Sequence, residues 1–140
     1  MTPELEEEII KKYPKIFHQE DEISGEVHIT CSYFQCGDGW YTLIDMICKH
    51  IQYYVDSMIG GLDEEERKYF QVVVREIKEK YGSLRFSVDG GDEYIAGMIT
   101  MVEAMSGKIC EECGNKSEIK TKGWIQNLCQ SCYDKINMNK

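Results

Sequence analysis

The chain has 140 residues, of which 42% are hydrophobic, and its formal net charge at pH 7 is −9. This length suits one ordinary domain with a small appendage, and a negative chain disfavours a general nucleic-acid binder, which neutralises phosphates. No apolar run approaches the roughly 18 residues of a membrane span, and the acidic start of the chain lacks the basic region of a secretory signal peptide. We therefore expect a soluble cytoplasmic protein with no membrane partner.

The N-terminal part predicts two helices and a strand. Residues 3–13 predict a short helix that begins after Thr2 and is ended by Pro14. Alternating apolar side chains over 26–33 predict a strand. Residues 40–59 repeat apolar side chains at helical spacing over a wide stripe, so this helix is expected to be central to the core.

The middle of the chain predicts a β-hairpin followed by a third helix. The acidic segment 63–66 is interpreted as a solvated loop or a helix start. Residues 69–89 alternate apolar and polar side chains around a glycine-containing turn at 80–83, which predicts a hairpin. A helix over 76–81 is the competing interpretation, because Glu and Lys are poor strand formers. Residues 92–106 predict a helix.

The last third contains two Cys-x-x-Cys pairs, Cys110 with Cys113 and Cys129 with Cys132, separated by fifteen residues. A two-residue gap lets both sulfurs of a pair face one centre, and the long segment between the pairs lets the chain return to complete a tetrahedron. This spacing favours one structural Zn²⁺, with an iron–sulfur centre as the alternative. A short helix that starts after Cys129, with the second pair at its beginning, would make the element treble-clef-like, and a plain zinc ribbon is the other possibility.

The other three cysteines are Cys31, Cys36 and Cys48, which bring the total to seven. An odd number disfavours a closed disulfide framework, and nothing in the sequence indicates an oxidising compartment. Free cysteines are among the most buried residue types, so we expect packed thiols. A second metal site with His28 or His50 is the alternative.

Together these elements predict an α+β fold in which helices pack on a small antiparallel hairpin. We divide the chain into a core domain at 1–107 and a four-cysteine zinc-binding element at 108–140. The charge is uneven, because residues 1–66 hold fifteen acidic and four basic side chains, whereas residues 67–89 hold six basic and three acidic ones. The chain is therefore expected to present two surfaces of opposite sign.

The basic segment is the candidate site for a small anionic ligand such as a nucleotide. Its cationic side chains would contact phosphates, and neighbouring aromatic rings would stack on a base. The residues of this predicted site are Lys78, Lys80, Tyr81, Arg85, Trp40 and Tyr41. Core packing is the alternative for the aromatic residues, and a solvated strand face is the alternative for the cations.

Four segments stand out in combination: GDGWY at 37–41, KEKYGSLRF at 78–86, CEECG at 110–114 and GW at 123–124. Over residues 36–133 they resemble a family of small proteins encoded in prophages and tailed phages. The resemblance implies a phage-derived protein that acts in the cytoplasm of a bacterial host. Because that family has no established activity, the resemblance implies a setting rather than a mechanism.

We therefore expect a non-enzymatic phage accessory protein that counters host defence by binding. Either its acidic surface engages a host protein, or its basic segment sequesters a nucleotide signal. The alternative is a nucleic-acid-binding or transcription-associated zinc-ribbon regulator that uses the lysines Lys116, Lys120, Lys122 and Lys135. An enzyme such as a nuclease is disfavoured, because the metal site is closed and no acid–base pair stands out. A homo-oligomer is left open.

Overall fold

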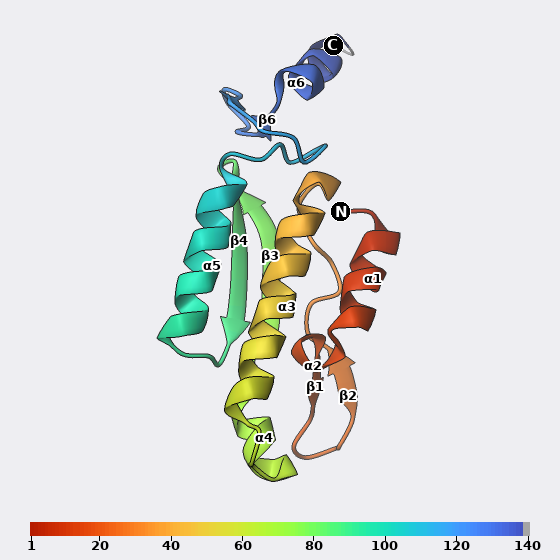
Figure 1. The fold of residues 1–140 in the computed structure, drawn as a ribbon. Coiled ribbons are helices and arrows are strands. Elements are labelled where there is room, and N and C mark those ends of the chain that lie inside the picture. The colour runs from red at the N-terminus through yellow and green to blue at the C-terminus, as the bar shows by residue number, and fades with distance from the viewer. Residues whose placement is uncertain (139–140) are drawn as a thin grey trace.

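The structure combines helices with small antiparallel sheets, which confirms the predicted α+β class. It is a computed structural model that describes residues 1–138, apart from the side chain of Ile119. In chain order the elements are α1 (Pro3–Lys12), α2 (Pro14–Phe17), β1 (His18–Glu20), β2 (Val27–Ile29), the 3-10 helix η1 (Asp38–Trp40), α3 (Tyr41–Met58), α4 (Glu64–Phe70), β3 (Val73–Lys80), β4 (Ser83–Asp89), α5 (Glu93–Ser106), β5 (Ile119–Lys120), β6 (Asn127–Leu128) and α6 (Gln130–Met138). Helices α3 and α5 lie beside the β3–β4 hairpin, and β5, β6 and α6 form one end of the molecule (Figure 1). None of the helices in the described part of the chain has the length and apolar character to cross a membrane.

The N-terminal segment differs from its prediction in two places. Pro14 ends α1 as predicted, but it also begins the short helix α2, which the sequence analysis did not predict, because proline suits the first position of a helix. The strand predicted over 26–33 is only the three-residue β2, which pairs with β1. Val27 and Ile29 are exposed, so the alternation of apolar residues does not mark a buried face. The segment contributes Phe17, at the end of α2, to the core instead.

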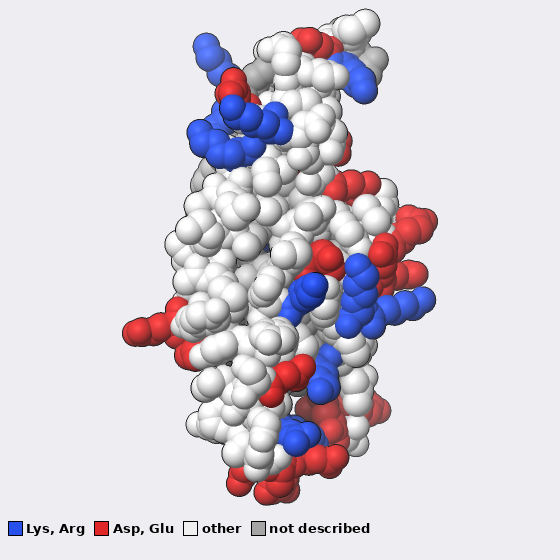
Figure 2. Space-filling view, viewed as in Figure 1, with Lys and Arg blue, Asp and Glu red and all other residues white. Residues whose placement is uncertain are grey.

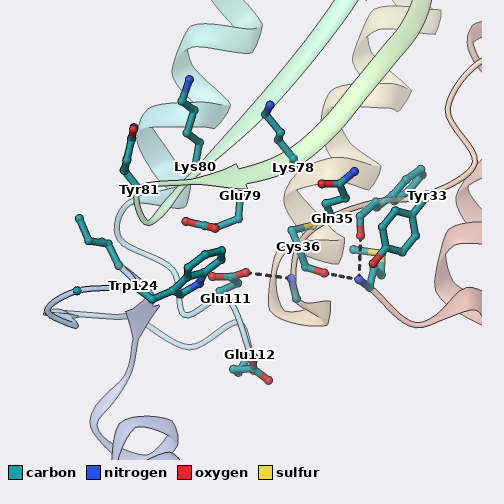
Figure 3. Close-up of a pocket in the computed structure, with 15 residues that line it drawn as sticks. Tyr33, Gln35, Cys36, Lys78, Glu79, Lys80, Tyr81, Glu111, Glu112 and Trp124 are labelled. Atoms are coloured by element: carbon teal, nitrogen blue, oxygen red, sulfur yellow. Dashed lines mark hydrogen bonds between the residues drawn. The ribbon is translucent and has the colours of Figure 1, made fainter.

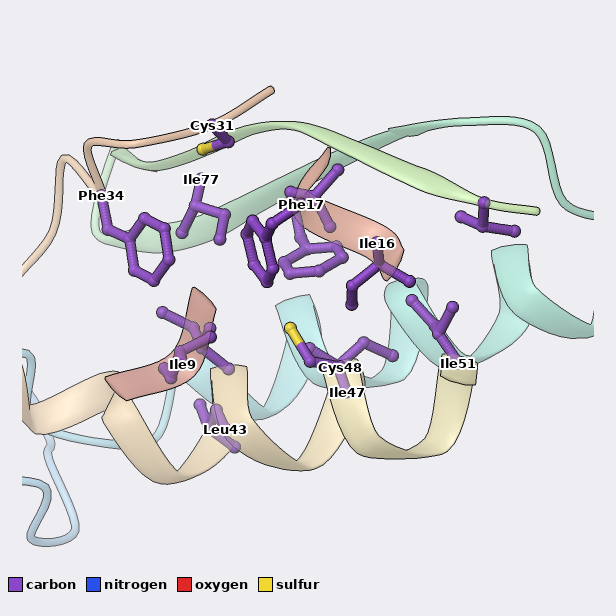
Figure 4. Close-up of a cluster of buried hydrophobic side chains, with 14 of the residues drawn as sticks. Ile9, Ile16, Phe17, Cys31, Phe34, Leu43, Ile47, Cys48, Ile51 and Ile77 are labelled. Carbon is purple, nitrogen blue, oxygen red and sulfur yellow. The ribbon is translucent and has the colours of Figure 1, made fainter. Parts of the chain in front are cut away.

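The predicted central helix is present as α3. Its buried side chains recur at helical spacing and include Ile47, Cys48 and Ile51. Figure 4 shows these three residues facing Phe17 and Ile77 across the core. The apolar stripe of α3 therefore joins the N-terminal helices to the hairpin.

The predicted hairpin is confirmed as β3 and β4, which pair in antiparallel register. Tyr81 and Gly82 form its two-residue turn, and both have positive φ, as a type I′ turn requires. The strand pairing excludes the competing helix over 76–81. Ile77 lies opposite Phe86 in the register, and both side chains are buried on the face that packs toward α3.

The acidic segment 63–66 starts a helix rather than a loop. The Asp63 side chain accepts a hydrogen bond from the backbone N–H of Glu66 and thereby caps α4. Helix α4 continues to Phe70, whose side chain is exposed. The hairpin consequently begins at Val73, four residues later than predicted.

Helix α5 covers the free edge of β4. The predicted helix is confirmed, and Asp92 caps it by accepting from the N–H of Ile95. At the other end, Ser106 Oγ accepts from the N–H of Leu84 at 2.8 Å. One turn earlier, a Glu103 carboxylate oxygen accepts from a second β4 amide at 3.0 Å. These side chains satisfy edge donors that would otherwise be open to pairing with another strand.

The three cysteines outside the Cys-x-x-Cys pairs are packed in the core. Cys31, Cys36 and Cys48 are all buried in the larger of two hydrophobic clusters, which confirms the prediction of packed thiols. In residues 1–138, the one group of side chains close enough to hold a metal ion does not include them. The alternative of a second metal site with His28 or His50 is therefore wrong. The smaller hydrophobic cluster lies in the C-terminal element.

Candidate metal centre and adjacent cleft

Four thiols converge at the C-terminal end of the molecule. The Sγ atoms of Cys110, Cys113, Cys129 and Cys132 all lie within 4.8 Å of one another, and those of Cys113 and Cys129 are 3.6 Å apart. A tetrahedral zinc ion with Zn–S bonds of about 2.3 Å needs sulfur–sulfur separations of about 3.8 Å. The group therefore fits a single metal ion, and the sequence predicted all four members.

The local backbone explains why the four sulfurs meet. Gly114 takes a positive φ directly after the first pair, and its N–H donates to the Cys110 carbonyl at 2.9 Å, which closes a tight turn. The hairpin β5–β6 then returns the chain, and Cys129 and Cys132 flank the start of α6. The Cys132 N–H donates to Cys129 Sγ at 3.5 Å and lowers the pKa of the Cys129 thiol, which favours the thiolate. Turn, hairpin and helix in this order make the element treble-clef-like rather than a plain ribbon.

The GDGW segment of the core contacts the turn that contains the first cysteine pair. The Gly39 N–H donates to the Glu111 carbonyl at 2.8 Å, and Trp40 Nε1 donates to the Ile109 carbonyl at 2.9 Å. A Cβ at Gly39 would lie 2.6 Å from the Gly114 nitrogen and closer still to the Cys110 carbonyl oxygen. Only glycine allows the two backbones to approach this closely.

A buried asparagine fixes the hairpin of the metal element to α5. Asn127 Nδ2 donates to the Ser106 carbonyl at 3.1 Å, and its side-chain oxygen accepts from the hydroxyl of Ser117. Its own carbonyl accepts from the Glu111 N–H at 3.0 Å. The sequence analysis did not single out this residue, because nothing in its neighbours along the chain indicates burial.

A cleft of about 710 Å³ lies where the hairpin tip meets the metal element (Figure 3). The cleft is lined by Met1, the stretch 33–37, the end of β3 with its turn, and parts of the metal element at 111–112 and 123–125. The Met1 ammonium donates to the carbonyls of Phe34 and Cys36. The stretch 33–37 is held there because its Gln35 exchanges backbone hydrogen bonds with β3, at 2.9 and 2.8 Å.

Two carboxylates line the cleft from different segments, Glu111 from the metal element and Glu79 from β3. Glu111 is only 8% exposed; one carboxylate oxygen accepts from the Gly37 N–H at 3.3 Å, and the other has no partner. Burial raises the pKa of Glu111 to about 7, and the negative charge of Glu79 acts in the same direction. Glu79 accepts from the Gly82 N–H at 2.7 Å through one oxygen.

Three of the six predicted anion-binding residues line this cleft, namely Lys78, Lys80 and Tyr81. The charged ends of the two lysines do not meet at one position in it. Lys78 Nζ lies 3.2 Å from a carboxylate oxygen of Glu76, and Lys80 Nζ lies 5.8 Å from the centre of the Tyr81 ring. In Figure 3 both lysines point away from Glu111. The cations at the rim are therefore already matched with groups of the protein itself.

The other three residues of the predicted anion site lie elsewhere. Trp40 is fully buried, so its ring has no free face for a base, as the core-packing alternative held. Tyr41 lies on α3, where its hydroxyl accepts from Lys12 Nζ at 3.2 Å. Arg85 is opposite Lys78 in the hairpin register, on the exposed face, and does not line the cleft. The structure does not assemble the predicted site as one surface.

The most exposed aromatic residue that lines the cleft is Trp124. It lies in the β5–β6 loop and is 80% exposed, and Tyr81 across the cleft is 69% exposed. The sequence analysis noted Trp124 only within the family resemblance. A tryptophan next to a glycine, in the loop between two metal-ligand pairs, was a usable signal of exposure.

The fold and the site thus define an α+β protein with a treble-clef-like four-cysteine element. Comparison with protein-family models, with curated proteins and with solved structures gave no match. The resemblance to phage proteins remains a prediction, and the function has to be inferred from the geometry of this chain.

Proposed function

We propose that this chain is a non-enzymatic binding protein in which one structural Zn²⁺ is held by the four cysteines. The observation that carries the metal assignment is the closed set of four mutually adjacent thiols. Soft thiolates select zinc or iron over harder ions, and four protein ligands leave no coordination position for a substrate. When bound, the metal ties the first cysteine turn to the start of α6.

The binding role is supported by the cleft beside the metal element. Trp124 and Tyr81 are large, mostly exposed rings at its walls, and residues of these types dominate the energetics of protein–protein contacts. The cations of the rim are matched within the chain, which favours a protein over a nucleotide as the partner. With the phage resemblance, we propose that the partner is a protein of a bacterial host's defence, engaged in the cytoplasm.

Site-specific photo-crosslinking in a bacterial host tests this function. The photoreactive residue benzoylphenylalanine replaces Trp124 in one variant and Tyr53, an exposed ring on α3, in the matched control. We expect a discrete protein adduct from position 124 that is absent from position 53. Equal adducts at the two positions, or none at 124, would contradict the proposal, as would turnover of a substrate by the purified zinc-loaded protein.

The second candidate, a nucleic-acid-binding module, is favoured by one observation. Lys116, Lys120 and Lys122 are exposed on the metal element, and Figure 2 shows basic side chains gathered at that end of the molecule. An exposed tryptophan beside lysines also suits stacking on unpaired bases. Electrophoretic mobility shifts on single-stranded DNA and RNA at low salt decide between the two, because phosphate contacts are strongest there. A shift that weakens steeply with salt would favour this candidate.

A further inference from the structure

The cleft holds two acidic side chains, Glu79 and Glu111, that form no ion pair in the described part of the chain; the Met1 ammonium, which also lines the cleft, donates to backbone carbonyls instead. Within residues 1–138, no Lys or Arg nitrogen and no terminal ammonium lies within 4.0 Å of the carboxylate of Glu79 or Glu111. Glu111 is more than nine-tenths buried, and its second oxygen accepts no hydrogen bond. A buried acceptor without a donor costs free energy that a ligand donor would recover. This side of the cleft therefore favours a cation.

The size of that cation follows from the spacing of the acids. The group of side chains close enough to hold a metal ion, in the part of the chain that is described, consists of the four cysteines and includes none of Glu79, Glu111 and Glu112. These three carboxylates thus do not gather around one ion. An organic cation with several donors would span them better than a metal ion.

The aromatic wall selects among organic cations. Figure 3 shows the Trp124 ring in front of the Glu111 carboxylate, with Glu79 directed into the cleft from β3. A guanidinium is planar, stacks on aromatic rings and donates bidentate hydrogen bonds to carboxylates, whereas a lysine ammonium is a compact, strongly hydrated charge. Because Trp124 is 80% exposed, its ring is accessible to a guanidinium that enters the cleft.

We propose that this cleft binds an arginine side chain that a protein partner presents. The guanidinium lies on the Trp124 ring and donates to the carboxylates of Glu79 and Glu111. The net charge of −9 steers a basic partner toward the molecule. This inference rests on the proposed binding function, for which it names the recognised group.

An NMR titration of the ¹⁵N-labelled, zinc-loaded protein tests the inference. The probes are an acetylated and amidated Gly-Arg-Gly peptide, the same peptide with citrulline or lysine in place of arginine, and guanosine monophosphate. We expect saturable shifts of the Trp124 indole N–H with the arginine peptide, and at least about tenfold weaker binding of the uncharged citrulline peptide. The indole of Trp40, buried against Ile109, serves as the internal reference.

Two substitutions complete the test. Glu79→Gln keeps an oxygen for the Gly82 N–H but removes the charge, so it is expected to weaken arginine binding about tenfold. Glu118→Gln removes an exposed charge of the metal element outside the cleft and is expected to change nothing. Equal binding of arginine and citrulline, an unchanged affinity in Glu79→Gln, or tighter binding of the nucleotide would overturn the inference. If crosslinking from position 124 persists in any of these cases, the proposed function stands and the arginine assignment alone fails.

Discussion

Gly39 is the residue at which the core and the metal element come closest. Its N–H donates to the Glu111 carbonyl, and the space that a side chain would need is taken by backbone atoms of Cys110 and Gly114. Backbone cannot move aside as the end of a flexible side chain can. Because Gly39 has no Cβ, the core and the metal element can approach this closely.

Gly39→Ala is therefore expected to destabilise the zinc-loaded protein by about 3 kcal/mol, the upper range for overpacking. Urea unfolding followed by circular dichroism measures this. The matched control is Gly97→Ala in α5, where a Cβ meets nothing within 4 Å; there we expect stabilisation of about 0.5–1 kcal/mol. Equal effects of the two substitutions on unfolding free energy would contradict the close approach of the two backbones at Gly39.

Glu6 gives a pH-dependent prediction. This side chain is buried and accepts from the Phe34 N–H, and burial raises its pKa above the ordinary value of 4.5. The folded state then binds this proton more tightly than the unfolded state, so the contribution of Glu6 to stability is present at low pH and is lost as pH rises through the folded pKa. Relative to the wild type, Glu6→Gln should gain stability between pH 4.5, the ordinary pKa, and pH 7.

Urea unfolding of both proteins at the two pH values, with zinc present throughout, measures this difference. Glu8→Gln, on the same helix but exposed, serves as the control and should show no comparable gain. A gain that shrinks as pH rises would have the wrong sign for a buried carboxyl group with a raised pKa.

At the scale of elements, helix α5 covers the edge of strand β4 and so protects the hairpin from pairing with another strand. Ser106 and Glu103 of α5 accept hydrogen bonds from Leu84 and Phe86, the two buried residues of β4. The turn of Tyr81 and Gly82 brings that strand back along β3. Helix α5 thus packs on the hairpin and also satisfies its edge.

Ser106→Ala leaves the buried Leu84 N–H without an acceptor, so we expect a loss of about 1–3 kcal/mol of unfolding free energy. Hydrogen exchange of the Leu84 amide should accelerate accordingly. Ser87→Ala, an exposed serine on the same strand, should cost less than about 0.5 kcal/mol. Slow exchange at Leu84 in the Ser106 variant would show that another group satisfies this amide.

The elements that the sequence predicts well are those whose signals are local. The apolar spacing of α3, the turn at 81–82 and the cap at Asp92 each lie within the segment that they define. The strand predicted at 26–33 is shorter and exposed, because alternation alone does not say whether a buried partner exists. The predicted start of the hairpin was wrong because α4, which begins after Asp63, continues to Phe70.

The candidate site likewise has one part that the sequence predicts, the four cysteines, and one part that it does not, the cleft. The four cysteines followed from spacing along the chain, because both gaps are set by the geometry of one tetrahedron. The cleft did not, since Glu79, Glu111 and Trp124 come from separate elements and meet only in the folded molecule. Grouping residues by charge along the sequence placed Lys78 and Arg85 in one site. They are opposite each other in the hairpin register, but Lys78 pairs with Glu76 and Arg85 does not line the cleft.

At the scale of the whole molecule, the metal element has only a small cluster of buried residues of its own. That cluster centres on Cys110, Leu128 and Cys129, so two of its three buried members are candidate metal ligands. An element of this size seldom holds together by apolar burial alone. The core, by contrast, has a large continuous cluster that does not depend on the cysteine pairs.

Removal of the metal should therefore loosen one end of the protein and spare the rest. With a strong chelator present, we expect amide exchange over 108–138 to accelerate by at least about a hundredfold, because metal binding supplies most of the folding free energy of such elements. Exchange over 41–58, the central helix, should change little. Mass-spectrometric hydrogen exchange measures both regions at once, and unfolding of both together would show that the core depends on the metal.

X-ray absorption at the zinc edge, on protein purified without added metal, tests the central assignment most directly. The proposed function predicts one zinc per chain, surrounded by the four sulfur atoms that the structure brings together, at about 2.3 Å and with no nitrogen or oxygen ligand. Iron in place of zinc, a mixed shell of sulfur with oxygen or nitrogen, or a metal-free protein with its thiols oxidised to disulfides would contradict it.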